Sequence, residues 1–195
     1  MSDTTTPTNA RDRILQTASR LFQLQGYSGT GLNQIIEESG SPKGSLYYYF
    51  PKGKEQLALE AIKITDNIVR RELKSHLNHY SDPIEAVQSI IQGLADKFCH
   101  PEDIEGVPIG LIALETWSRS DDLRHECEKA FEGWESLYTA KLIENGFSKE
   151  LAMELAVLIN SMIEGALTIS VTKQTNTPLL IVKNQIPQLL HKKTR

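Results

Sequence analysis

The sequence of 195 residues has little of what marks secreted and membrane proteins. It contains only two cysteines, Cys99 and Cys127, and they form no CxxC pair, which argues against a disulfide framework or a zinc site. No apolar run approaches the ~18 residues of a membrane span, because the longest apolar-rich stretch, residues 151–171, contains Glu154 and Glu164. The first 13 residues lack the apolar segment of a secretory signal. We therefore expect a cytoplasmic protein without a membrane partner.

Motifs of the common enzyme classes are also lacking. There is no P-loop, HExxH, GxSxG or GxGxxG pattern. Ser170 and Lys173 form an SxxK pattern, but its SDN and KTG companions are missing. His76 and His79 are spaced to share a metal on a helix, yet no third ligand is near them in the sequence. We therefore predict no enzyme activity, no cofactor and no metal site.

Alternating strand patterns are missing as well, so the sequence predicts an all-α fold of about nine helices. Asn9 is a good N-cap for the first helix and Gly26 a good C-terminal residue. Thr30 is predicted to cap the second helix, and Ser41 with Pro42 to begin the third. The expected helices cover residues 9–26, 30–40, 41–50, 54–79, 82–98, 109–117 and 121–144, a segment from 148 onward, and 178–191.

Charge is unevenly distributed along the chain. The formal net charge is −4, which taken alone argues against a nucleic-acid partner. Residues 1–54, however, contain six basic and four acidic residues, whereas the remainder contains 15 basic and 21 acidic residues. A mildly basic N-terminal part thus precedes an acidic body, a split that could also arise by chance.

The segment from Thr30 to Lys54 has the pattern of a helix-turn-helix. Two short helices are separated by a Ser-Gly-Ser turn, as that motif requires. A rotation of about 100° per residue places Leu46 toward the core of the second helix. Pro42, Tyr49 and Phe50 then flank Leu46, whereas Gly44, Tyr47 and Tyr48 point outward, with Ser45 at the side and Lys43 in the first turn.

This outer face has the chemistry of a DNA reader. Gly44 leaves room for a groove wall, and Lys43 can reach a phosphate or a guanine edge. The hydroxyls of Tyr47 and Tyr48 can contact phosphates, and Lys54 begins a helix whose free N–H groups favour an anion. Two alternatives remain from the residues alone: the tyrosines could form an aromatic core cluster, or the chain could be a helical interaction protein that binds no DNA.

The stretch SGSPKGSLYYYFPKGKEQLA resembles the DNA-binding signature of the TetR/AcrR family of bacterial transcription regulators, and ARDRILQTASRLFQLQGYSGTGLNQIIEESG resembles the family's opening helices. The commonest spacing in the family puts a lysine three residues after the phenylalanine. Here Phe50 and Lys54 are separated by one additional residue. This spacing and the segment GVPIGLIALE at residues 106–115 resemble the LmrA/YxaF-like branch.

The resemblance implies a homodimer that binds a palindromic DNA operator. It implies a helix-turn-helix domain over residues 9–53, here called the head, and a ligand-binding and dimerisation domain over 54–195. Residues 1–8 are polar and Thr-rich, which predicts a disordered tail. The third helix would enter the major groove, with the two heads about 34–36 Å apart. Lys43 and Tyr48 would read bases, and Ser45 and Tyr47 would position the helix beside them. Thr30 and Lys54 would hold phosphates, which also positions the head on the DNA.

For the body the resemblance implies a small-molecule effector, apolar or aromatic, whose binding relieves repression. From the residues alone, each pocket candidate fits plain core better than a ligand wall. The candidates for the dimer interface could equally pack within one chain. The pocket candidates are Phe98, Ile109, Ile112, Glu115, Trp117, Trp134, Tyr138 and Met162. The interface candidates are Met162, Gly165, Ala166, Ile169, Leu179, Val182, Ile186 and Leu189.

Overall fold

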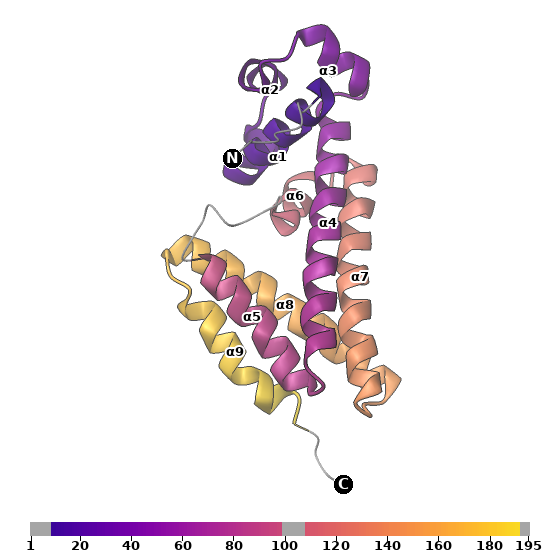
Figure 1. The fold of residues 1–195 in the computed structure, drawn as a ribbon, viewed down its shortest axis with the longest axis vertical. Helices are drawn as coiled ribbons and strands as arrows, with labels where there is room; N and C mark the ends of the chain where they lie inside the picture. Colours follow the sequence, from indigo (N-terminus) through magenta and orange to yellow (C-terminus); the bar gives the residue numbers. More distant parts are fainter. Residues whose placement is uncertain (1–8, 99–107, 192–195) are drawn as a thin grey trace, which may run out of the picture. The chain divides into compact units, whose positions relative to one another are not determined.

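The computed structural model describes residues 9–98 and 108–191, which form nine α-helices and no strand (Figure 1). The predicted all-α fold of about nine helices is therefore confirmed for the described chain. The tail predicted over residues 1–8 lies outside the described residues, as do most of the residues between the helices predicted over 82–98 and 109–117.

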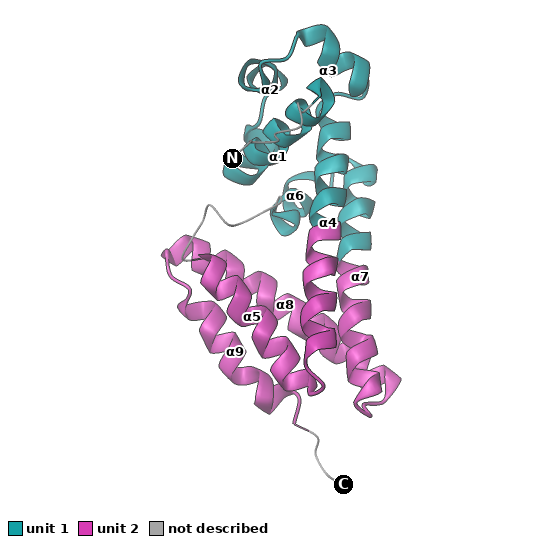
Figure 2. Ribbon diagram, in the orientation of Figure 1, with its two compact units in different colours: residues 1–66, 106–130 teal, residues 67–105, 131–195 magenta. Residues whose placement is uncertain are grey.

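The chain divides into two compact units (Figure 2). Unit 1 comprises residues 1–66 and 106–130, and unit 2 comprises residues 67–105 and 131–195. The helices α4 (Lys54–His79) and α7 (Asp121–Glu144) each contribute their first part to unit 1 and the remainder to unit 2. The domain boundary expected between residues 53 and 54 thus falls inside unit 1.

Unit 1 contains the head together with three helical segments of the body. The helices α1 (Ala10–Gly29), α2 (Leu32–Ser39) and α3 (Lys43–Tyr49) are joined by α6 (Ile109–Thr116) and by the beginnings of α4 and α7. Helix α1 packs against α2, α3 and α6. The packing is apolar, because the side chains that α1–α3 direct inward are large and fully buried: Ile14, Leu21, Phe22, Ile35, Leu46 and Phe50.

Of the three helix starts predicted in the head, one agrees with the structure and two differ. Asn9 caps α1 as expected, with its Oδ1 accepting the backbone N–H of Asp12 at 2.9 Å. Thr30 does not cap α2, because its hydroxyl donates to the Gly26 carbonyl at 2.8 Å, and Gly31 precedes the helix instead. Ser41 likewise does not cap α3: its hydroxyl faces the Ser39 carbonyl at 3.5 Å, and Pro42 occupies the N-cap position.

Unit 2 is a helical bundle built around α5 (Pro83–Phe98), α8 (Lys149–Lys173) and α9 (Thr177–Leu189), with the second halves of α4 and α7. Helix α9 packs against both α5 and α8. Ser148 caps α8 as predicted, since its hydroxyl oxygen accepts the N–H of Leu151 at 3.3 Å. Pro178 lies in the first turn of α9, where its missing N–H costs no helical hydrogen bond.

Helix α8 is long and apolar enough to cross a membrane by length and composition alone. One side of it belongs to the core of unit 2, where Ala152, Leu155, Ala156, Ile159 and Ile163 are buried. A core helix of a folded bundle passes the same test of length and composition, and α8 packs against α9 in unit 2.

Candidate nucleic-acid interface and effector cavity

Helix α3 presents two faces of different character. Leu46 and the following Phe50 are fully buried, and they fix the helix on the head. On the opposite side Lys43 and Gly44 are exposed, and the side chains of Tyr47 and Tyr48 are 45% and 79% exposed. Ser45 is half-buried at the edge of this face. The two tyrosines therefore do not join the core of unit 1, and the orientation predicted from helical periodicity agrees with the structure.

Two glycines lie beside this face, and they differ in role. Gly40 has a φ of 59°, the left-handed conformation that lets the chain turn sharply between α2 and α3. Gly44 differs, because a Cβ atom built at this position would meet no atom within 4 Å. Packing within the described chain therefore does not require glycine at position 44, and the open space above it is available to an approaching partner.

Ion pairs and a cation–π contact hold the head together beneath α3. Arg20 on α1 pairs with Glu38 on α2. Arg11 pairs with Glu60 of α4 at 2.5 Å, and its guanidinium carbon lies 5.3 Å from the centroid of the Phe50 ring. These contacts link α1 to α2, to α4 and to the Phe50 ring that follows α3.

Thr30 and Lys54, the two expected phosphate contacts, are already partnered inside unit 1. The Thr30 side chain is 1% exposed and donates to the Gly26 carbonyl. The Lys54 ammonium donates to the carbonyls of Tyr27 at 2.9 Å and Thr30 at 3.0 Å, and it lies 4.3 Å from the centroid of the Tyr27 ring. In this conformation both side chains organise the end of α1, and neither is directed at solvent.

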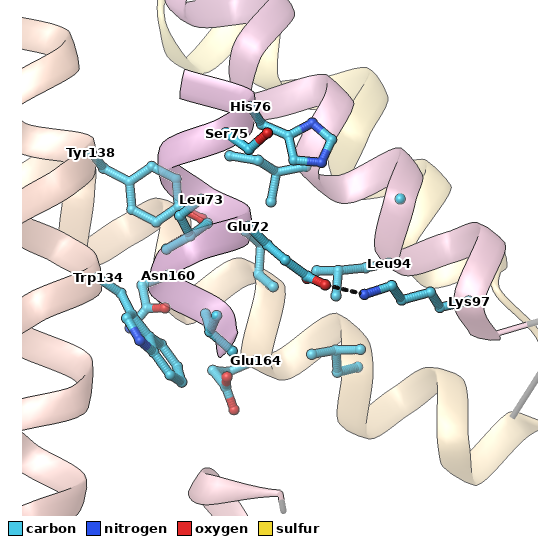
Figure 3. Close-up of a pocket in the computed structure, with 15 residues that line it drawn as sticks. Glu72, Leu73, Ser75, His76, Leu94, Lys97, Trp134, Tyr138, Asn160 and Glu164 are labelled. Carbon is cyan, nitrogen blue, oxygen red and sulfur yellow. Dashed lines mark hydrogen bonds and ion pairs between the residues drawn. The ribbon is translucent and has the colours of Figure 1, made fainter. Parts of the chain in front are cut away.

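Unit 2 contains a partly open cavity of about 250 Å³ (Figure 3). Its walls come from α4, α5, α7 and α8, with Trp134 and Tyr138 projecting from α7. The wall is mainly apolar, with polar groups at a few points, which is the usual character of a small-molecule site. The lining residues are Val69, Glu72, Leu73, Ser75, His76, Ile90, Gly93, Leu94, Lys97, Trp134, Tyr138, Asn160, Ile163, Glu164 and Leu167.

The polar groups of the cavity are held by neighbours in different ways. Glu72 on α4 pairs with Lys97 on α5 (Figure 3). His76 Nδ1 lies 2.9 Å from the Ser89 hydroxyl. Burial raises the pKa of the Glu164 carboxyl above its ordinary value. Burial, and then the nearby charge of Glu164, also raise the pKa of the Tyr138 hydroxyl, which keeps the phenol protonated. The cavity therefore offers hydrogen-bonding groups within an apolar wall.

The structure brings only two of the eight pocket candidates, Trp134 and Tyr138, into this cavity. Ile109 and Ile112 are buried in unit 1, and Trp117 is 66% exposed. Glu115 instead accepts hydrogen bonds from the backbone N–H groups of Tyr27 and Ser28. Phe98 and Met162 are half-buried and do not line the cavity.

The candidates for the dimer interface fall on both sides of their helices. Gly165 and Ile169 lie on the exposed side of α8, and Met162, Val182 and Leu189 are half-buried. Ala166 lies on the buried side of α8, and Leu179 and Ile186 of α9 are fully buried within the chain. These last three side chains are core residues of unit 2, and in this conformation they are not available to a partner.

Sequence reasoning missed most of the polar wall of the cavity. Glu72 and His76 are four residues apart on α4, as are Asn160 and Glu164 on α8, so each pair lies on one helix face. A polar residue at core spacing within an apolar helix was the signal that could have indicated Glu164. No comparable signal exists for Lys97, because a lysine near the end of a helix is ordinary.

Known proteins are similar in sequence to nearly the whole chain. The family model described as bacterial regulatory proteins, tetR family, matches residues 14–61. The model described as transcriptional regulator LmrA/YxaF-like, C-terminal domain, matches residues 83–185. The HTH-type regulator YxaF of Bacillus subtilis is 52% identical over 185 residues, which cover 95% of this chain and 97% of YxaF. The regulator LmrA of the same organism is 48% identical over 182 residues, covering 93% and 97%.

A repressor from Escherichia coli is similar at lower sequence identity. NemR, an HTH-type transcriptional repressor, is 28% identical over 142 residues, covering 71% of this chain and 69% of NemR. The crystal structure of its reduced form superimposes with a TM-score of 0.83 at 21% identity, covering 96% of this chain and all of that one. At this identity the superposition establishes the shared fold.

Proposed function

This chain belongs to the tetR family of bacterial transcriptional regulators, in its LmrA/YxaF-like branch, and on that basis we propose that it is a dimeric repressor released from a palindromic operator by a small molecule. Members of this family are DNA-binding regulators and not enzymes. The operator, the effector and the repressive sign are our proposal, and we place its action in the cytoplasm.

The observation that carries the proposal is the exposed face of α3. Two tyrosines and a lysine stand in solvent on a helix that the buried Leu46 and Phe50 hold in place. Exposing aromatic rings to water is unfavourable unless a partner covers them, and the hydroxyls and ammonium of this face match phosphates and base edges. Lys43 and Tyr48 are the base readers in this proposal, and Ser45 and Tyr47 position the helix.

The cavity of unit 2 is the proposed effector site. Its volume of about 250 Å³ and its mainly apolar wall fit a small apolar or aromatic compound. Trp134 and Tyr138 provide flat surfaces for an aromatic ring, while Asn160 and Glu164 can orient a polar substituent. Release then follows if the effector binds a conformer whose heads no longer fit adjacent major grooves. A coupling of about 1–3 kcal/mol changes operator affinity roughly 5- to 150-fold.

The exposed side of α8 is the proposed dimer surface. Leu158 and Ile169 are 44% and 45% exposed, and Gly165 lies between them on the same side of the helix. Apolar side chains next to an exposed glycine allow a second helix to approach closely and bury the whole stripe. Two copies of this chain would then place two α3 helices on one operator.

A gel-shift experiment tests this proposal directly. DNA flanking the gene is mixed with the protein in moderate salt, with and without a panel of aromatic compounds. Retarded DNA that is released by one compound would support a ligand-relieved repressor, and retardation that appears only with a compound would reverse the sign. A folded, dimeric protein that retards no flanking DNA under any condition would count against regulation at that locus.

A further inference from the structure

Helix α1 is broken within its last two turns. Gly26 has φ 72° and ψ 176°, so the helical backbone stops there and resumes for a single turn over residues 27–29. The first N–H groups after such a break have no carbonyl one turn earlier to bond. Forming a single helical turn is unfavourable, because several residues are ordered for few hydrogen bonds. Such a turn therefore needs contacts from other parts of the chain to keep its conformation.

Glu115 of α6 supplies those partners. Its Oε2 accepts the N–H of Tyr27 at 2.6 Å and the N–H of Ser28 at 3.3 Å. A carboxylate at the beginning of a helical turn also interacts favourably with the positive end of the turn's dipole. The fit depends on Gly26, since a Cβ there would lie 3.0 Å from both carboxylate oxygens. The carboxylate of α6 thus caps the broken turn of α1.

Lys54 holds the other end of the same turn. Its ammonium donates to the carbonyls of Tyr27 and Thr30, and burial lowers the pKa of this ammonium while the charge of Glu115 opposes the shift. Lys54 is the first residue of α4. The short turn of α1 is therefore clamped between an anion from α6 and a cation from α4, all within unit 1.

We propose that Glu115 is a positioning residue that sets the direction in which the head leaves α4, and thereby the operator spacing that the protein accepts. Glu115 touches no DNA in this assignment, and it acts by fixing the last turn of α1. The inference rests on the proposed function, because spacing has meaning only for a dimer on a two-part operator.

The test uses the full-length protein and synthetic duplexes. The half-site that the wild-type protein selects from a random library is built into inverted repeats whose spacer varies one base pair at a time. Fluorescence anisotropy then gives the affinity for each spacer. We expect a sharp optimum for the wild type. For Glu115→Ala we expect the ratio between the best and the neighbouring spacers to fall by about 2- to 30-fold, the range seen when a coupling residue is removed.

Two further variants separate positioning from folding. Glu115→Gln keeps the length and one acceptor oxygen, so its spacing profile should be intermediate even if Glu115→Ala is poorly folded. Glu38→Gln is the matched control. Glu38 lies on α2 and pairs with Arg20 on α1, so this substitution removes a carboxylate that contacts α1 and leaves α6 untouched. Its spacing profile should equal that of the wild type, although it loses an ion pair of the head.

The outcomes are distinguishable. Glu115 variants with the wild-type spacing profile would overturn this inference and leave the proposed function standing. A uniform loss of affinity at all spacers, with the ratio unchanged, would also overturn it, because that is the effect of a merely structural residue. If the wild type selected no half-site, the proposed function itself would fail, and the inference with it.

Discussion

Helices α3 and α8 use their exposed sides in contrasting ways. In unit 1, α3 exposes a lysine, a glycine and two tyrosines, and only Leu46 of this short helix is fully buried. In unit 2, α8 exposes aliphatic residues such as Leu158 and Ile169 over a long helix with eight buried positions. A polar and aromatic face suits a charged, hydrated partner such as DNA, whereas an aliphatic face suits another protein surface.

The two proposed sites also differ in how readily their residues can be recognised from the sequence. The proposed DNA-contacting side of α3 is the outside of its helix, so polar residues there differ in type from the apolar residues of the core. The side chains of the proposed effector site lie inside the bundle of unit 2, where Trp134 and Tyr138 are 6% and 3% exposed. At such positions the wall of a cavity and an ordinary core have the same composition.

The largest expected effect on operator affinity follows from disrupting the exposed aliphatic side of α8. Ile169→Glu places a charge on the proposed dimer surface, and a monomer loses the second head on the operator. We expect a monomer by analytical ultracentrifugation and an operator affinity lower by about 100-fold or more, since the second contact is no longer intramolecular. Leu24→Glu, at a residue of α1 that is 71% exposed, is the control and should remain dimeric. A dimeric Ile169→Glu protein would place the interface elsewhere.

Substitutions on the two sides of α3 should have different effects: one on the buried side should lower stability, and one on the exposed side should weaken operator binding. Leu46→Ala removes a fully buried side chain, and the cost is about 2–5 kcal/mol of unfolding free energy. Tyr48→Ala removes a side chain that is 79% exposed, so its urea midpoint should match that of the wild type while operator binding weakens. Chemical denaturation followed by circular dichroism measures the first effect and anisotropy the second. Equal stability losses would contradict the outward placement of Tyr48.

Reversing the charge of Lys43 tests the chemistry of the same face. Lys43→Glu should weaken specific binding by roughly 5- to 150-fold, the loss of one good base-edge contact. If Lys43 contacts a phosphate, the slope of log affinity against log salt should instead drop by about one. Lys149→Glu, an equal charge change at the exposed start of α8, is the control. Equal losses in both variants would indicate that only net charge matters.

The smallest expected effect is on the pH dependence of stability, and it concerns Glu164, the half-buried acid of the cavity. Because burial raises the pKa of Glu164 in the folded state, the folded protein retains this proton more tightly than the unfolded chain does. Stability therefore falls as pH rises from the ordinary value of 4.5 through the folded pKa.

Glu164→Gln removes this ionisation. It should raise the thermal midpoint by a few degrees at neutral pH and leave the midpoint unchanged in acid, where the wild-type side chain is neutral as well. Glu154→Gln, at an exposed acid of the same helix, is the control and should do neither. Differential scanning calorimetry across this pH range measures the effect, and a Gln variant that is less stable than the wild type at neutral pH would contradict the sign.

Helical periodicity predicted the fold and the orientation of α3 because both depend on which residues recur at one face. Leu46, Tyr47 and Tyr48 could be assigned in this way without any structure. The partners of Glu115 could not, because a residue of α6 meets the N–H groups of Tyr27 and Ser28 only after long-range folding. Leu179 and Ile186 were placed at the dimer surface because an apolar stripe does not reveal whether it faces its own chain or another.

The most direct test of the account is a selection from a random duplex library by the full-length wild-type protein. An operator read by two copies of α3 must have two-fold symmetry, so we predict an enriched inverted repeat whose half-site centres are about 34–36 Å apart. Enrichment of a single asymmetric site, or of no sequence at all by a folded protein, would contradict the account.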